Sequence, residues 1–160
     1  MKKTSYEKIS IRPDKNEIVL FFHIDDQSNR HSKMREFCGM CRDGEAICDV
    51  LIFYTQKDDS NKNGNMDLIC FVESKGGDVV KACKQIKNTY EHLKPEFEKN
   101  NYCKSIEYVV YINTTGASSQ DVKRAKRELY RLFPKKLCEI KEKGNVGQHL
   151  QQCFKEINKN

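Results

Sequence analysis

With 160 residues, the chain is long enough for one domain with a sizeable hydrophobic core. Hydrophobic residues make up 38% of it and charged residues 32%, which predicts a folded, soluble protein with a polar surface. No stretch approaches the roughly 18 apolar residues that span a bilayer, so a transmembrane protein is excluded. The formal net charge of +6 is compatible with a polyanionic partner, although many soluble proteins are equally basic.

The N-terminus and the cysteines indicate a compartment. Lys2 and Lys3 resemble the basic start of a signal peptide, but no apolar run follows them. We therefore expect a cytoplasmic protein without membrane contact, in which the eight cysteines are mostly reduced. Most of them lie in apolar runs, where a free thiol packs as a small core residue.

The first half of the chain predicts strands. Two runs rich in β-favouring residues, 7–12 and 17–24, flank a turn at 13–16 and predict a hairpin. Residues 34–40 are expected to form a short strand. Longer apolar runs predict three strong strands, at 48–55, 66–75 and 105–114.

Helical periodicity begins after the third of these runs. Apolar residues recur at three- and four-residue steps over 79–97, with Asp78 as the expected N-cap and Pro95 expected to kink or break the last turns. Further helices are predicted at 120–133 and 146–157, with a strand between them at 136–141.

This order of elements predicts the fold class. Antiparallel strands come first and strand–helix–strand crossovers follow, so we expect an α/β fold with a central mixed sheet flanked by helices. The predicted single domain has three parts. They are an N-terminal β-hairpin extension (1–33), a core (34–115), and a C-terminal part with a basic helix, a strand and a last helix (116–160).

The most informative stretch is the strand that ends at Glu73 and Lys75. The strand contains the apolar run 68–72, which predicts that it is buried on both faces, and the two charged residues follow this run. Side chains two residues apart on a strand point to the same side, so this carboxylate and ammonium stand together. If 48–55 and 66–75 pair as a hairpin, Asp49 lies beside them.

Two carboxylates and a lysine at one sheet edge suit a hard divalent cation such as Mg²⁺ or Mn²⁺. The ion would polarise a phosphoryl oxygen and activate water, while the lysine would orient that water or stabilise developing charge. The alternative is a surface ion pair between Glu73 and Lys75, with Asp49 capping a turn.

Asp49, followed after 23 residues by Glu73-Ser74-Lys75 and then by a helix, resembles the PD-(D/E)XK nuclease superfamily. The resemblance covers roughly residues 34–115. It implies the restriction-endonuclease-like fold with an αβββαβ core. It also implies that Asp49, Glu73 and the backbone carbonyl of Ser74 ligate Mg²⁺ (or Mn²⁺), and that Lys75 handles the nucleophilic water.

The resemblance implies two further positions. In many members a glutamine with a catalytic role follows on the next helix, and Gln85 matches that place. The tyrosine expected four residues later is replaced by Thr89. The acidic residue that a first helix often supplies corresponds to Glu36 or Glu45, or is missing.

The helix at 120–133 predicts a nucleic-acid-binding surface. Its basic side chains, with two lysines after it, suit a phosphate backbone held mostly without reading the sequence. A merely solvated helix face is the alternative. These residues are Lys123, Arg124, Lys126, Arg127, Arg131, Lys135 and Lys136.

Together these features predict a Mg²⁺-dependent endonuclease, a hydrolase of phosphodiester bonds, with DNA as the expected substrate and RNA as the alternative. A homodimer or a separate targeting protein is a possible partner. The alternative function is a catalytically inactive nuclease-fold module that binds nucleic acid or protein.

Three cysteines, Cys38, Cys41 and Cys48, are spaced like part of a zinc site. His31 or Cys70 could supply the missing ligand. Chance clustering of core thiols is the favoured interpretation.

Overall fold

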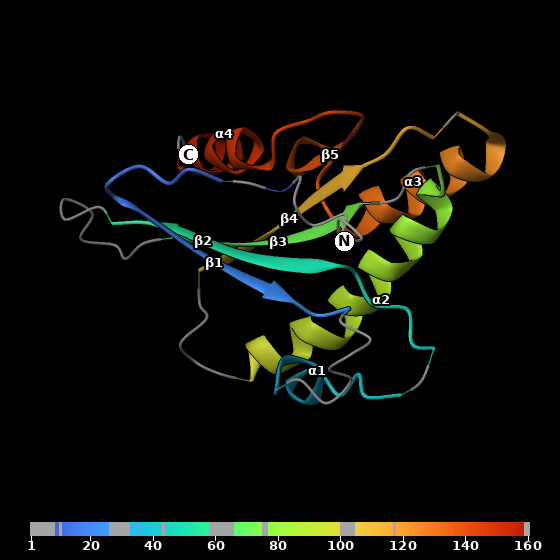
Figure 1. Cartoon of the computed structure of the whole chain (residues 1–160), viewed down its shortest axis with the longest axis horizontal. Helices are drawn as coiled ribbons and strands as arrows, with labels where there is room; N and C mark the ends of the chain where they lie inside the picture. The colour runs from blue at the N-terminus through green and yellow to red at the C-terminus, as the bar shows by residue number, and fades with distance from the viewer. Residues whose placement is uncertain are drawn as a thin grey trace, which may run out of the picture.

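The structure is a computed structural model that describes residues 9, 11–25, 33–42, 44–57, 66–74, 77–99, 105–116 and 118–158. A mixed five-stranded sheet forms the middle layer, with helices on both faces (Figure 1). In spatial order, its strands are β1 (Glu17–His23), β2 (Val50–Gln56), β3 (Asp67–Ser74), β4 (Ile106–Asn113) and β5 (Cys138–Lys141). The predicted α/β class with a mixed, helix-flanked sheet is therefore confirmed.

The pairing divides the sheet into two halves. β1, β2 and β3 form an antiparallel meander, whereas β3, β4 and β5 run parallel to one another. Parallel neighbours need crossover connections, which α2 (Val79–Glu98) and α3 (Gln120–Leu132) provide. Both helices therefore begin at the sheet edge where β3 and β4 end.

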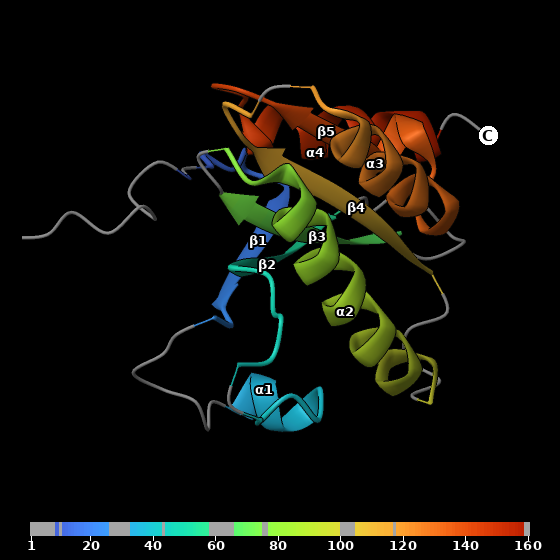
Figure 2. The ribbon, with the colours of Figure 1, turned by 90° about the vertical axis from the view of Figure 1, so that its right-hand side faces the viewer.

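The helices cover the two faces unequally (Figure 2). α2, α3 and the short α1 (Lys33–Phe37) lie on one face, and α4 (Val146–Ile157) lies on the other. A 3₁₀ turn, Lys135–Leu137, leads into β5. No helix in the described part of the chain is long and apolar enough to cross a membrane.

β3 is the most buried strand, as its apolar run predicted. Its side chains alternate between two cores: Ile69 and Phe71 point towards α2 and α3, whereas Cys70 and Val72 point towards α4. All four are fully buried. A strand with helices on both faces must be apolar on both, which explains the continuous run.

The predicted N-terminal hairpin is not formed. Of the run 7–12, the described residues 9, 11 and 12 are not in a strand, and β1 is a strand of the central sheet that pairs with β2. Ile9 and Ile11 instead pack against the core beneath α4. The N-terminal part is therefore not a separate hairpin extension.

The predicted strand at 34–40 is instead helix α1, which ends at a turn where Gly39 has a φ of 66°. Met34 and Cys38 are four residues apart and both contact the core on the α2 side. The spacing of these apolar residues fits one helical face as well as a strand, so packing decides between them.

α2 continues through Pro95 to Glu98, so of the two predicted effects, a kink or a break, the break does not occur. Proline removes the hydrogen bond to the carbonyl four residues earlier, which belongs to Glu91. Both residues are exposed, so water can satisfy that carbonyl. The loss is small near a helix end.

Gly116 marks a close approach between the loop after β4 and the start of α2. A Cβ atom at this position would lie 2.6 Å from the carbonyl oxygen of Gly77 and 2.9 Å from Cγ2 of Val79. Both contacts are closer than packed atoms tolerate. The glycine therefore lets the two crossover connections meet at the end of the sheet.

We expect Gly116→Ala to lower the free energy of unfolding by about 1–3 kcal/mol, because the methyl group overpacks this contact. Denaturant unfolding measures the change. Gly77→Ala is the matched control, because a Cβ there meets nothing within 4 Å. Equal stability of the two variants would contradict the close approach.

Candidate functional site

Asp49 and Glu73 lie side by side at the end of the β2–β3 hairpin, as the sequence predicted. Val50 of β2 is paired with Val72 of β3. Because the strands are antiparallel, Asp49, one residue before Val50, lies beside Glu73, one residue after Val72. The backbone N–H of Asp49 donates to Oε2 of Glu73 at 3.0 Å. In return, the N–H of Ser74 donates to Oδ2 of Asp49 at 3.0 Å. We call Asp49 and Glu73 the carboxylate pair.

The carboxylate pair is buried. Asp49 is 5% exposed and Glu73 is 0% exposed. Carboxylates in such surroundings need strong hydrogen bonds, and bonds from backbone N–H groups to ionised oxygens meet that need. By strand alternation, Glu73 points to the same face as Phe71, towards α2. The alternative prediction of a surface ion pair is therefore wrong for Glu73.

Cys48 lies next to the carboxylate pair and is itself fully buried. Burial, and then the negative charge of Glu73, raise the pKa of its thiol well above the ordinary value. The thiol is therefore neutral at physiological pH, and a neutral thiol is a poor nucleophile.

Lys75 lies outside the described residues, so its predicted position beside Glu73 stays a prediction. Ser74 is described and is half-buried at the end of β3. Its backbone N–H is already bound to Asp49, so Ser74 helps to orient the carboxylate pair.

Gln85 is buried on α2 and belongs to a row of polar side chains that holds the segment before β2. Its Nε2 donates to the carbonyl of Ile47 at 2.5 Å. Asn88 donates to the carbonyl of Ala46 at 2.8 Å, and Oγ1 of Thr89 accepts the N–H of Cys48 at 2.9 Å. We call Gln85, Asn88 and Thr89 the polar row.

The polar row determines where Asp49 lies, because it binds the three residues that precede it. Sequence reasoning found Gln85 only through the resemblance and missed the roles of Asn88 and Thr89. The available signal was polar residues at three- and four-residue steps on α2. The described contact of Gln85 is a positioning one, and its catalytic role stays a prediction.

The two candidates for a further acidic residue are engaged or distant. Glu45 accepts the N–H of Arg42 and lies 3.7 Å from Nε2 of His92. Glu36 is exposed on α1, whose Phe37 packs against Phe97 near the end of α2. Between Gln85 and Phe97 a helix rises by about 18 Å. Glu36 is therefore remote from the carboxylate pair.

The zinc site considered for the three cysteines is not formed. Cys38, Cys41 and Cys48 are all described, and no three His, Cys, Asp or Glu side chains among the described residues are grouped to hold a metal ion. Cys70 points into the opposite core, beneath α4. His31 lies outside the described residues. Cys38 and Cys48 are core thiols, as the other interpretation has it, whereas Cys41 is half-buried.

The basic residues of α3 face outward. Six of the seven predicted nucleic-acid-binding residues are exposed, and Lys126 is half-buried. Arg124 pairs with Asp121 at 3.5 Å, so part of its charge is offset. We call these residues the basic face: Lys123, Arg124, Lys126, Arg127, Arg131, Lys135 and Lys136.

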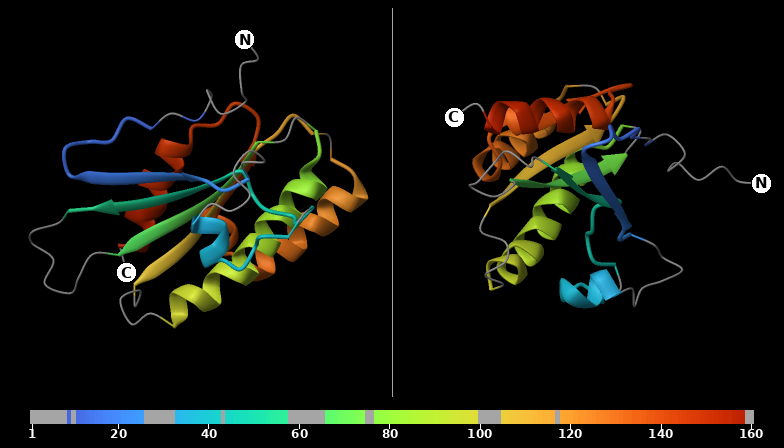
Figure 3. Two further views of the ribbon diagram at one scale, coloured as in Figure 1. Left: turned by 60° about the horizontal axis from the view of Figure 1, so that its bottom comes forward. Right: turned by 90° about the vertical axis from the view of Figure 1, so that its left-hand side faces the viewer.

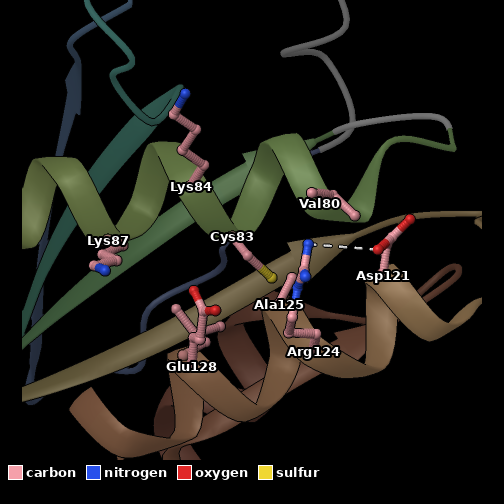
Figure 4. Close-up of a pocket in the computed structure, with 9 residues that line it drawn as sticks. Val80, Cys83, Lys84, Lys87, Asp121, Arg124, Ala125 and Glu128 are labelled. Atoms are coloured by element: carbon pink, nitrogen blue, oxygen red, sulfur yellow. Dashed lines mark ion pairs between the residues drawn. The ribbon is translucent and has the colours of Figure 1, made fainter.

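A groove of about 390 Å³ lies between α2 and α3 (Figure 4). Lys84 and Lys87 line it from α2, and Asp121, Arg124 and Glu128 line it from α3. Charges of both signs therefore meet in the groove, and it is not a dedicated anion site.

No protein-family model matches this chain, and no curated protein is found to be similar to it. Its function is therefore inferred from the geometry of the site.

We expect Thr89→Val to lower the free energy of unfolding by about 1–3 kcal/mol, because it leaves the buried N–H of Cys48 without an acceptor. Amide hydrogen exchange at Cys48 should accelerate in the same variant. Thr89→Ser is the matched control: it keeps the hydroxyl group and loses one methyl group, worth about 1 kcal/mol. Slow exchange at Cys48 in Thr89→Val would contradict the role of the polar row.

Proposed function

We propose that the protein is a metal-dependent nuclease that hydrolyses phosphodiester bonds, with DNA as the expected substrate and RNA as the alternative. One observation carries the proposal. The two acidic residues that the PD-(D/E)XK resemblance selects, 24 residues apart in the chain, are joined by a direct hydrogen bond and oriented by a second one.

The order of elements supports a restriction-endonuclease-like fold. Apart from the short α1, which lies between β1 and β2, three antiparallel strands, a helix and a parallel strand follow one another from β1 to β4. This order corresponds to the βββαβ part of the core that the resemblance implies. The helix implied before these strands is not present among residues 9 and 11–16, which are the described residues before β1.

The donor set of the carboxylate pair fits Mg²⁺ or Mn²⁺. Such ions take oxygen ligands and usually only one or two protein carboxylates. Asp49, Glu73 and the carbonyl of Ser74 would hold the ion. Gln85 binds the carbonyl of Ile47, two residues before Asp49, and its Oε1 atom is buried without a hydrogen-bond partner among the described residues, which suits a site that a ligand or water completes.

Bound there, the ion would supply Lewis-acid polarisation of a phosphoryl oxygen and an activated water. The residues of the chain prepare this chemistry. The two backbone hydrogen bonds orient the carboxylates before substrate arrives, and the polar row keeps Asp49 in register with Glu73. Lys75 would orient the attacking water and stabilise negative charge on it.

The basic face would hold the phosphate backbone. α3 begins at the sheet edge where β4 ends, and β4 runs parallel to β3, so Lys123 lies towards the same edge as Glu73. From Lys123 to Arg131 the helix rises by about 12 Å, which provides a line of positive charge and no base-reading element. We therefore propose weakly specific or structure-selective binding.

A second function is favoured by the burial of the carboxylate pair. Because Glu73 is 0% exposed, a nuclease-fold protein that only binds nucleic acid or protein is the alternative. Such a module needs the basic face but no metal.

We expect Asp49→Asn and Lys75→Ala each to reduce cleavage of DNA with Mg²⁺ or Mn²⁺ by roughly 100-fold or more, the size of losing one electrostatic stabiliser. Linear, circular and single-stranded DNA and RNA are compared. Asp67→Asn is the matched control, because Asp67 is exposed at the other end of β3. Equal activity in all variants would assign cleavage to another site.

Calorimetric titration with Mn²⁺ separates the two functions. A nuclease should bind the ion with an affinity that Asp49→Asn and Glu73→Gln abolish. No cleavage and no metal affinity, with DNA binding retained, would establish the binding module instead.

We expect the triple variant Lys123→Gln, Arg127→Gln and Arg131→Gln to bind duplex DNA more weakly. The slope of log affinity against log salt should fall by about 0.9 for each phosphate group that the variant no longer neutralises. Fluorescence anisotropy over a salt series measures both quantities.

The control is Lys15→Gln, Lys57→Gln and Lys155→Gln, three exposed lysines away from α3 whose loss gives the same net charge. Equal weakening in both triple variants would mean that net charge, and not the basic face, drives binding.

A further inference from the structure

β1 is an edge strand that lacks the usual protection of an edge. It is the outermost strand beside β2, and no described strand pairs with its other side (Figure 3). Its seven residues, Glu-Ile-Val-Leu-Phe-Phe-His, contain no proline, glycine or lysine. Such residues normally prevent edge strands from pairing with another chain.

The exposed apolar surface of the protein gathers on this strand. Leu20 is 52% exposed, Phe21 40% and Ile18 38%, and these are three of the five exposed large hydrophobic side chains among the described residues. Exposed apolar residues that cluster, in contrast to scattered ones, mark an interaction site.

The backbone of β1 also presents hydrogen-bonding groups outward. The N–H of Ile24 donates to the carbonyl of Asp49, and the carbonyl of Asn16 accepts the N–H of Lys57, so even-numbered residues bond towards β2. Along a strand these groups alternate between the two edges. Val19 and Phe21 therefore direct their N–H and C=O groups to the outer edge.

An apolar hollow of about 590 Å³ lies beside the same edge. Phe22 and Phe53 of the sheet line it together with Met34 and Phe37 of α1 and Phe97 of α2. Ile18, Leu20 and Phe22 share one face of β1, the face towards α2. A side chain opposite Phe22 on an added strand would therefore enter this hollow.

We propose that β1 is a homodimer interface, at which it pairs antiparallel with β1 of a second copy about a two-fold axis at Leu20. This is the register in which all seven residues overlap. Leu20 then faces Leu20 of the other copy, Val19 faces Phe21, and Ile18 faces Phe22. Pairs of aromatic and β-branched residues are favourable across strands.

The strand is self-complementary in this register, which selects a second copy over an unrelated peptide. Ile18 of each copy lies opposite Phe22 of the other and fills the other's hollow. At the strand ends Glu17 meets His23, so no like charges face each other. Val19 and Phe21 of the two copies exchange the hydrogen bonds that each strand presents outward.

The symmetry has a consequence for the arrangement of the sites. An antiparallel edge pair keeps the sheet faces aligned, because its two-fold axis is perpendicular to the sheet. Both α2 layers, and therefore both carboxylate pairs, lie on the same side of one continuous sheet. The interface itself does not rest on the proposed nuclease activity.

Sedimentation velocity over a concentration series tests the interface. We expect the wild type to be dimeric and Leu20→Lys to be monomeric, because two lysines would face each other directly at the two-fold axis. Val80→Lys is the matched control: Val80 is 40% exposed on α2, and this variant should stay dimeric. A monomeric wild type, or a dimer that survives Leu20→Lys, overturns the proposal.

A charge-swap mixture separates interface loss from misfolding. Leu20→Lys and Leu20→Glu, each monomeric alone, should form a one-to-one heterodimer when mixed. Failure of this mixture to associate overturns the proposed register.

Oxidative cross-linking supplies an independent measurement of the register. Residue 20 would form a non-hydrogen-bonded pair with itself, with Cα atoms about 4.5 Å apart, within the range of a disulfide. Leu20→Cys should therefore give a covalent dimer, whereas Ile18→Cys and the wild type should not. Cross-linking of Ile18→Cys in place of Leu20→Cys overturns the register.

Discussion

The register between β2 and β3 is the constraint on which the candidate site depends. The carboxylate pair is buried, and carboxylates there are tolerated only when strong donors meet them. The two donors are the backbone N–H groups of Asp49, which directly precedes β2, and of Ser74, the last residue of β3. A slip of one residue would turn Glu73 to the face covered by α4 and remove both hydrogen bonds.

Several parts of the fold maintain this register. β3 is apolar towards both faces, so a slip would exchange the side chains of two packed cores. The polar row on α2 holds the residues that lead into β2. Gly116 lets the crossover loop after β4 approach the start of α2 closely. α2 therefore packs against the core on one side of the sheet and also holds the residues that position Asp49.

Two other surfaces of the protein differ in charge. α3 turns its basic residues outward on the same side of the sheet as the carboxylate pair, which suits a polyanion near that pair. β1, in contrast, exposes apolar side chains, and some of its backbone N–H and C=O groups point to the outer edge of the sheet. A basic face and an apolar edge can be occupied together because they lie on different elements.

The sequence by itself determined the parts that have a strong local pattern. The buried run of β3, the amphipathic α2 and α3, and the β2–β3 hairpin follow from periodicity, and the hairpin alone predicts that Asp49 meets Glu73. The tertiary structure decided the rest: α1 in place of a strand at 34–40, the pairing of β1 with β2, and the contacts of Asn88 and Thr89. These depend on contacts between residues distant in the chain, and short apolar runs fit a helix and a strand equally well until packing selects one.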